Sequence, residues 1–125
     1  MLISFCTIVN DRPGGGTFVS AAAGRSRVEL VDNILVGAAR MDLRIAHATV
    51  RNSEGSRVDF ADSSRFDYRL RRSSTLVGAA GMAGTLGEGR VVPEREYVHP
   101  ASSVALARFS GITPLSPGAF QRIAP

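Results

Sequence analysis

The apolar and polar positions of residues 26–51 repeat with a helical period. At about 100° per residue, apolar side chains spaced three or four apart fall on one face. These side chains are Val31, Ile34, Leu35, Ala38, Met41 and Ile45. Ser26 and Glu29 fit a capping box at the start of the segment. Strand alternation fits only residues 41–45, so the pattern predicts one long amphipathic helix over residues 26–51.

The chain before this helix reads as a β-hairpin. Residues 2–9 are apolar and rich in β-branched side chains, which is typical of a buried strand. Pro13 and the glycines at 14–16 indicate a turn, and residues 17–22 can return as a second strand.

A second hairpin is predicted from two alternating runs, residues 57–61 and 65–71. Charge selects its register, because like charges directly opposite each other are unfavourable. The register that places Asp59 opposite Arg69 avoids such pairs and keeps the apolar residues on one face.

The remaining chain is rich in glycine and proline. Residues 90–98 suggest an extended run, residues 103–110 suggest two helical turns, and residues 112–125 suggest an extended surface tail. The expected fold is a single α+β domain over residues 1–125. In it, a small antiparallel sheet of two β-hairpins packs on one long amphipathic helix, and the C-terminal half is irregular.

This arrangement would bury a small set of apolar side chains together. They are Phe5, Ile8, Val31, Ile45, Phe60, Phe66, Tyr68 and Leu70. Aromatic residues make up only 6% of the chain, so a monomer would have a marginal core. We therefore expect a homo-oligomer or a larger protein assembly.

The composition excludes several kinds of chemistry. The chain has fifteen arginines and no lysine, which rules out a Schiff base and a Walker-A phosphate loop. One cysteine, Cys6, forbids an intrachain disulfide, and the two histidines match no metal-ligand spacing. We expect no cofactor, no metal site and no assignable catalytic residue. The sequence has no secretion signal and no apolar run near the ~20 residues of a membrane span, so a cytoplasmic or intravirion location is expected.

Arginines between residues 40 and 72 suggest two basic binding surfaces, one on the predicted helix and one on the second hairpin, which would point apart if the two elements pack by their apolar faces. The candidate residues are Arg40, Arg44, Arg51, Arg57, Arg65, Arg69, Arg71 and Arg72. Guanidinium groups bind phosphates and carboxylates in a forked geometry. The leading function is therefore a non-enzymatic, basic structural or assembly subunit that contacts nucleic acid or an acidic partner, with a phage or virus particle component as one form.

Residues 75–84 resemble the dinucleotide fingerprint of extended short-chain dehydrogenases, a strand followed by GxxGxxG. The resemblance implies that Gly78, Gly81 and Gly84 would line a pyrophosphate. The family's Tyr-x-x-x-Lys pair is missing because the chain has no lysine. A nucleotide- or dinucleotide-binding enzyme unit is thus the alternative function.

Two further segments carry candidate chemistry. The glycines at 14–16 with Thr17 could form an anion-binding nest of backbone amides, although a plain loop is the more common meaning. Glu94 and Glu96 share a strand face and could act as acid and base, although an exposed polar strand is favoured.

Overall fold

The computed structural model describes residues 1–24, 27–81, 85–86, 89–98, 102–106 and 114–125. Its elements are β1 (Leu2–Ser4), β2 (Thr7–Val9), β3 (Thr17–Ala21), β4 (Val28–Val36), β5 (Arg40–Leu43), β6 (Ala48–Gly55), the 3-10 turn η1 (Arg57–Asp59), β7 (Phe60–Asp62), the 3-10 turn η2 (Ser63–Arg65), β8 (Asp67–Leu70), β9 (Thr85–Leu86), β10 (Gly89–Arg90), β11 (Arg95–Val98) and β12 (Ser102–Ala105). Apart from the two 3-10 turns, the regular elements of the described residues are all β-strands.

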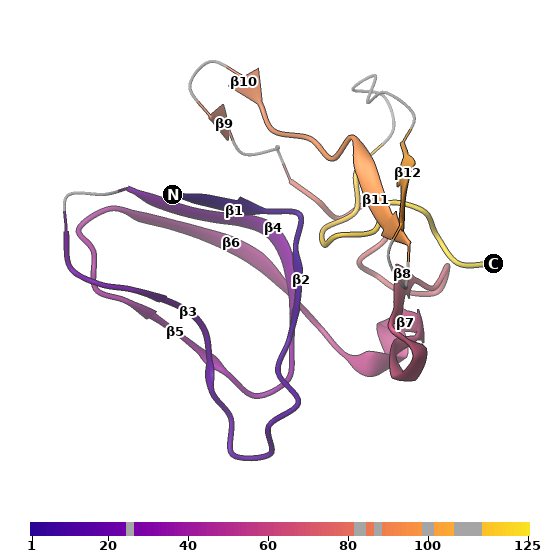
Figure 1. Ribbon diagram of the computed structural model, residues 1–125, viewed down its shortest axis with the longest axis horizontal. Helices are drawn as coiled ribbons and strands as arrows, with labels where there is room; N and C mark the ends of the chain where they lie inside the picture. Colours follow the sequence, from indigo (N-terminus) through magenta and orange to yellow (C-terminus); the bar gives the residue numbers. More distant parts are fainter. Residues whose placement is uncertain (25–26, 82–84, 87–88, 99–101, 107–113) are drawn as a thin grey trace.

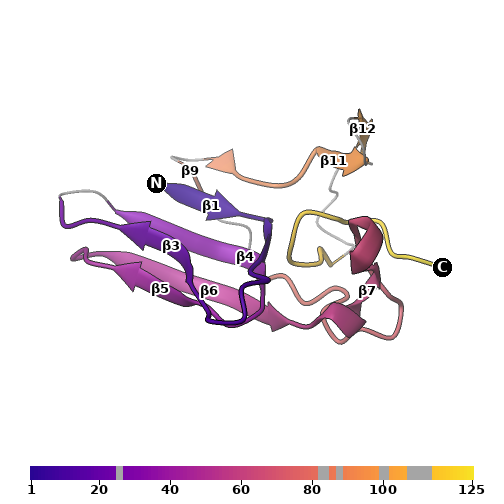
Figure 2. The ribbon, with the colours of Figure 1, turned by 60° about the horizontal axis from the view of Figure 1, so that its bottom comes forward.

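The first half of the chain winds as a parallel β-solenoid. β1 and β2 both pair with β4 in parallel, and β4 pairs in parallel with β6. On a second side β3 pairs in parallel with β5. Successive turns of the chain therefore stack as coils, with β1–β2, β4 and β6 on one side and β3 and β5 on the other (Figures 1 and 2).

The predicted long helix is wrong. Its residues form β4, β5 and the start of β6, and none of the described residues lies in an α-helix. β4 is buried on both faces, so its apolar residues do not alternate. Asp32 also adopts a left-handed backbone, with φ of 56°, and forms a bulge opposite β6. A doubly buried strand interrupted by a bulge imitates helical spacing. Ser26, the predicted helix cap, lies outside the described residues.

The antiparallel sheet of two hairpins is also wrong. In the N-terminal half β2 and β3 do not pair with each other, because each pairs in parallel with a strand of the next coil. The later hairpin is present as β7 and β8, but in a register that pairs Phe60 with Leu70. The predicted register, with Asp59 opposite Arg69, is therefore wrong. A register shift after Phe60 places Asp62 opposite Asp67, and Arg69 on the same strand compensates the charge of Asp67.

The C-terminal half contributes two more short pairings. β9 pairs with β10 and β11 pairs with β12, both antiparallel. The strand β12 occupies the start of the segment predicted to be helical, so that part of the prediction is wrong; residues 107–113 lie outside the described residues.

The main apolar cluster lies where the solenoid meets the hairpin. Ile34 and Val36 of β4 pack with Phe60 and Leu70 of the hairpin, all four being buried. The ring of Tyr68 meets that of Phe60 edge to face at a centroid distance of 5.3 Å. This cluster includes only part of the predicted core. Phe5 and Val31 are also buried, whereas Phe66 is 58% exposed at the hairpin turn.

A ladder of side chains stacks the coils at one corner. The Asn33 Oδ1 accepts a hydrogen bond from the backbone N–H of Cys6 at 2.9 Å. Its Nδ2 donates to the Ile3 carbonyl at 3.0 Å and to the Asn52 Oδ1 at 2.8 Å. Asn33 thus links the first coil to the third. Asn52 ends the ladder, since its buried Nδ2 has no hydrogen-bond partner in the described part of the chain.

Replacing Asn33 by alanine tests this ladder. Asn33→Ala leaves the Cys6 N–H, the Ile3 carbonyl and the Asn52 amide oxygen without this partner, so we expect it to lower the free energy of unfolding by about 3 kcal/mol. The matched control is Asn10→Ala, which removes two exposed hydrogen bonds, one donated to the Ala38 carbonyl and one accepted from the Arg12 N–H, and should cost about 1 kcal/mol. Urea unfolding followed by circular dichroism measures both. Equal losses would contradict a central role for Asn33.

Candidate functional site

The eight candidate arginines do not form one surface. Five of them make ion pairs within the chain: Arg44 with Asp42, Arg51 with Asp32, Arg57 with Asp11, Arg65 with Asp62, and Arg69 with Asp67. Their charges are therefore partly compensated where they lie. Arg40 and Arg72 make no ion pair within the described residues, and Arg71 is bound by backbone carbonyls.

Three of the candidates, Arg69, Arg71 and Arg72, line one cavity of about 380 Å³. We call it the arginine cavity. Its other lining residues are Ala61, Ser73, Ala124 and Pro125. The hairpin supplies one wall, and the chain end supplies the other because Ala124 donates its N–H to the Leu70 carbonyl and forms a parallel bridge with Arg71.

The charges around the arginine cavity are unequal. Arg69 is held by Asp67 through two hydrogen bonds, of 2.9 and 2.7 Å. The hydrogen bond from Arg69 keeps the pKa of the Asp67 carboxyl below its ordinary value, and the same bond raises the pKa of Arg69. Arg71 donates from Nε to the Phe60 carbonyl at 2.6 Å and from Nη2 to the Ala61 carbonyl at 3.1 Å. These acceptors fix the guanidinium without neutralising it.

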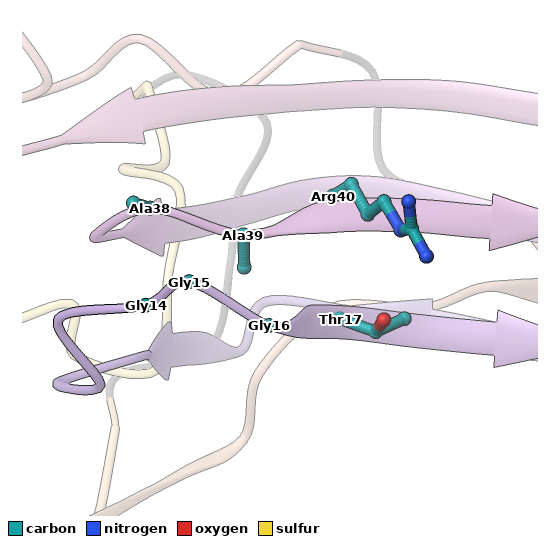
Figure 3. A pocket seen from close by; sticks show the side chains of 7 residues that line it. All are labelled: Gly14, Gly15, Gly16, Thr17, Ala38, Ala39 and Arg40. Atoms are coloured by element: carbon teal, nitrogen blue, oxygen red, sulfur yellow. The ribbon is translucent and has the colours of Figure 1, made fainter.

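A second cavity, of about 600 Å³, opens between the first and second coils (Figure 3). We call it the glycine groove. It is lined by Gly14, Gly15, Gly16, Thr17, Ala38, Ala39 and Arg40. Thr17 and Arg40 lie side by side because they are register partners on β3 and β5.

The predicted anion nest at residues 14–17 is only partly available. The N–H of Gly15 donates to the Arg12 carbonyl at 3.0 Å, which closes a turn. Gly15 has a φ of 78° and Gly16 packs against the Asn10 side chain. The groove therefore brings Arg40 to the glycine loop but does not direct all of the loop amides outward.

The glycines that resemble a dinucleotide fingerprint lie in a segment that packs on the solenoid. The N–H of Gly81 donates to Asp32 Oδ1 at 2.8 Å, and that of Gly78 donates to Ser116 Oγ at 3.0 Å. A Cβ at Gly81 would lie 2.6 Å from Cζ of Arg51, so the glycine allows the guanidinium to pack there. Gly84 lies outside the described residues.

Asp32 is a key polar residue that the helical reading missed. Its side chain is buried, binds the Gly81 amide and pairs with Arg51 at 3.4 Å, while its carbonyl accepts from Gly118 at 2.9 Å. The sequence does carry a signal for the bulge at this position. Asp32 and Asn33 interrupt an apolar, strand-like run, and such a pair favours a local break in a strand.

Glu96 is a second buried carboxylate with structural partners. It is fully buried on β11 and accepts from the backbone N–H groups of Gln121 and Arg122, both at 2.9 Å. Its other oxygen accepts from Arg122 Nε at 2.8 Å. Glu94 is exposed, so the two carboxylates of the sequence motif have different environments.

Comparison with protein-family models, curated proteins and solved structures finds no match to this chain. Within the described residues, no helix has the length and apolar character to cross a membrane. In the same part of the chain no three His, Cys, Asp or Glu side chains gather as a potential metal site.

Gly81→Ala tests the contact between the Gly81 segment and the solenoid. The added methyl group should displace the Arg51 guanidinium from Asp32 and lower the free energy of unfolding by about 1 kcal/mol. In an Arg51→Ala background the same substitution should have little effect, because no guanidinium is present to displace. A double-mutant cycle in urea gives the coupling, and equal costs in both backgrounds would contradict the assigned contact.

The ion pair beside the arginine cavity predicts a pH dependence. Because the folded-state pKa of Asp67 is lowered, its stabilisation is complete above the unfolded pKa of about 3.9 and is lost as pH falls through the folded pKa. The difference in unfolding free energy between wild type and Asp67→Asn should therefore shrink as pH falls from 7 to 3. Urea titrations at each pH measure it, with Glu54→Gln as a control for removal of a carboxylate elsewhere. A difference that stays constant would contradict the prediction.

Proposed function

We propose that this chain is a non-enzymatic binding module of a protein assembly, and that its arginine cavity holds a carboxylate of an acidic partner protein. A guanidinium group binds a carboxylate through paired, charge-assisted hydrogen bonds. The cavity offers Arg71 and Arg72 for that purpose, with the hydroxyl of Ser73 on its wall.

The position of Arg71 carries the proposal. The carbonyls of Phe60 and Ala61 hold its guanidinium in place, so little side-chain entropy remains to be lost on binding. Neither carbonyl carries a formal charge, and Arg71 and Arg72 form no ion pair among the residues that the structure describes. A fixed cation with a second cation beside it on the same cavity wall favours an anionic group.

The surroundings favour a protein partner over nucleic acid. Most of the other candidate arginines are paired with acids of this chain, so they do not form a continuous track for a phosphate backbone. The hairpin and the turn before it also expose Val58 (79%) and Phe66 (58%). Both side chains are available to a protein partner that covers the hairpin.

The nucleotide-binding alternative has weaker support from the geometry. Gly78 and Gly81 use their amides to bind Ser116 and Asp32. Those amides would have to leave their partners before they could bind a phosphate. No helix begins after Gly78 within the described residues, so the helix N-terminus of a dinucleotide site has no counterpart there.

Binding of a fluorescent octaglutamate peptide, followed by anisotropy at low salt, tests the proposal. Arg72→Glu should weaken binding at least tenfold, because it replaces a cation of the cavity by an anion. The matched control is Arg65→Glu, which makes the same change of net charge on an exposed hairpin residue paired with Asp62. It should change the affinity less than twofold.

Three outcomes would overturn the proposal. One is the absence of peptide binding to the folded wild type. Another is an equal loss of affinity in Arg72→Glu and Arg65→Glu, which would indicate that binding depends on net charge alone. The third is a preference for a 20-nucleotide thymidine strand over the peptide, lost on Arg72→Glu. That result would assign the cavity to nucleic-acid phosphates.

A further inference from the structure

The glycine groove lies where loops of two successive coils meet. The loop at residues 14–16 leads into β3, and the loop at residues 37–39 leads into β5. Figure 3 shows the two loops beside each other, with Thr17 and Arg40 at the start of the paired strands. Because β3 and β5 pair in parallel, both loops lie at the same end of this side of the solenoid.

Asn10 fixes the two loops relative to each other. Its backbone N–H donates to the Val36 carbonyl at 2.8 Å, and its Nδ2 donates to the Ala38 carbonyl at 2.7 Å. Its Oδ1 accepts from the Arg12 N–H at 3.3 Å. Gly37 has a φ of 96°, which lets its loop approach the Asn10 backbone closely. The walls of the groove are thus in place before a ligand binds, which lowers the entropy cost of binding.

The groove is lined by residues whose hydrogen-bond donors are unused in the described part of the chain. Four backbone N–H groups have no acceptor there: those of Gly14, Gly16, Ala38 and Ala39. The Thr17 hydroxyl forms no hydrogen bond with the described residues, and the Arg40 guanidinium forms no ion pair with them. A guanidinium group, a hydroxyl group and unbonded backbone N–H groups around one cavity are donors that suit an anion.

The acids that are close to the groove in sequence have partners of their own. Asp42, two residues after Arg40 on β5, accepts from Nε of Arg44 at 3.1 Å. Asp11, which precedes the glycine loop, forms an ion pair with Arg57. Neither carboxylate lines the groove, and the described lining carries positive charge only. An anion in the groove would therefore meet a cation without a carboxylate on the same wall.

We propose that the glycine groove binds a phosphate group, either as inorganic phosphate or as the monoester of a small molecule. A phosphate monoester has three terminal oxygens and nearly two negative charges at neutral pH, so it can accept from guanidinium, hydroxyl and amide groups together. A carboxylate has only two oxygens and one charge. The volume of the groove, about 600 Å³, is that of a small-molecule site.

An isolated phosphate suits the groove better than a nucleic-acid backbone. A nucleic-acid backbone is bound by several cations that follow its successive phosphates. The groove supplies one cation, Arg40, and the next one along the chain, Arg44, is engaged by Asp42.

Titration of ¹⁵N-labelled protein with inorganic phosphate, followed by amide NMR shifts, tests the site. Saturable shifts should appear at the groove amides, those of Gly14, Gly16, Ala38 and Ala39. Arg40→Gln should weaken the binding that these shifts report at least tenfold, because it removes the cation of the groove. The matched control is Arg72→Gln, which removes the same charge at the arginine cavity and should change that affinity less than twofold.

Thr17→Val tests the hydroxyl without a change of charge or shape. Loss of one hydrogen bond should weaken phosphate binding about threefold or more. The matched control is Thr49→Val, the same exchange at an exposed position of β6, which should leave the affinity unchanged. Thr17→Val binding as tightly as wild type would remove the hydroxyl from the site and overturn the proposed set of donors.

Phenyl phosphate distinguishes the two sources of the phosphate group. Binding at least fivefold tighter than inorganic phosphate would assign the groove to a monoester, and equal affinity would assign it to inorganic phosphate. Both results support the site.

Three results would overturn the proposal. The first is the absence of saturable shifts at the groove amides of the folded wild type up to about 50 mM phosphate. The second is an equal loss of affinity in Arg40→Gln and Arg72→Gln, which would indicate that binding depends on net charge alone. The third is acetate binding as tightly as phosphate at the same ionic strength, which would contradict the choice of phosphate over carboxylate.

Discussion

The side chain of Asn33 holds the three coils together at the corner of the solenoid. One amide group accepts from the first coil and donates to both the first and the third. An aspartate has no N–H to donate, and a leucine of similar volume would leave the backbone groups of the neighbouring coils unpaired inside the protein. The strand has a bulge at Asp32, next to this corner, and there the carboxylate and carbonyl of Asp32 accept hydrogen bonds from the C-terminal half. The Gly81 and Gly118 segments pack on the solenoid through those two groups.

The hairpin is positioned by β4, the strand that carries Asp32 and Asn33. β4 turns Ile34 and Val36 toward Phe60 and Leu70, and the end of β8 then meets the chain end at Ala124. The arginine cavity forms in that junction. Its geometry therefore depends on a strand about thirty residues earlier in the sequence, although none of the cavity's own residues belongs to the solenoid.

Local extended structure could be predicted from the sequence, but strand partners could not. Residues 2–9 and 17–22 contain strands, and the hairpin near residue 65 forms, because β-branched side chains and short alternations act locally. The helix over residues 26–51 failed because burial on both faces and the bulge at Asp32 replaced alternation with a spacing of three and four. Parallel pairing between coils is a non-local property, and no short motif predicted it. The grouping of Arg69, Arg71 and Arg72 was predictable because they are close in sequence. The ion pairs of Arg51 with Asp32 and of Arg57 with Asp11 were not predictable, because they join residues that only the fold brings together.

The contacts of Asp32 and Thr7 with the C-terminal half also bear on how the chain folds. Stacking of the coils joins residues about 20 to 27 apart, as in the pairs Val28–Ala48 and Leu2–Glu29. The hydrogen bond from the Ala119 N–H to the Thr7 hydroxyl closes a loop of 112 residues. Since the entropy cost of loop closure grows with loop length, the coils can form first and present a finished surface. On this ground we expect the C-terminal half to dock on the coils last and to open from them first.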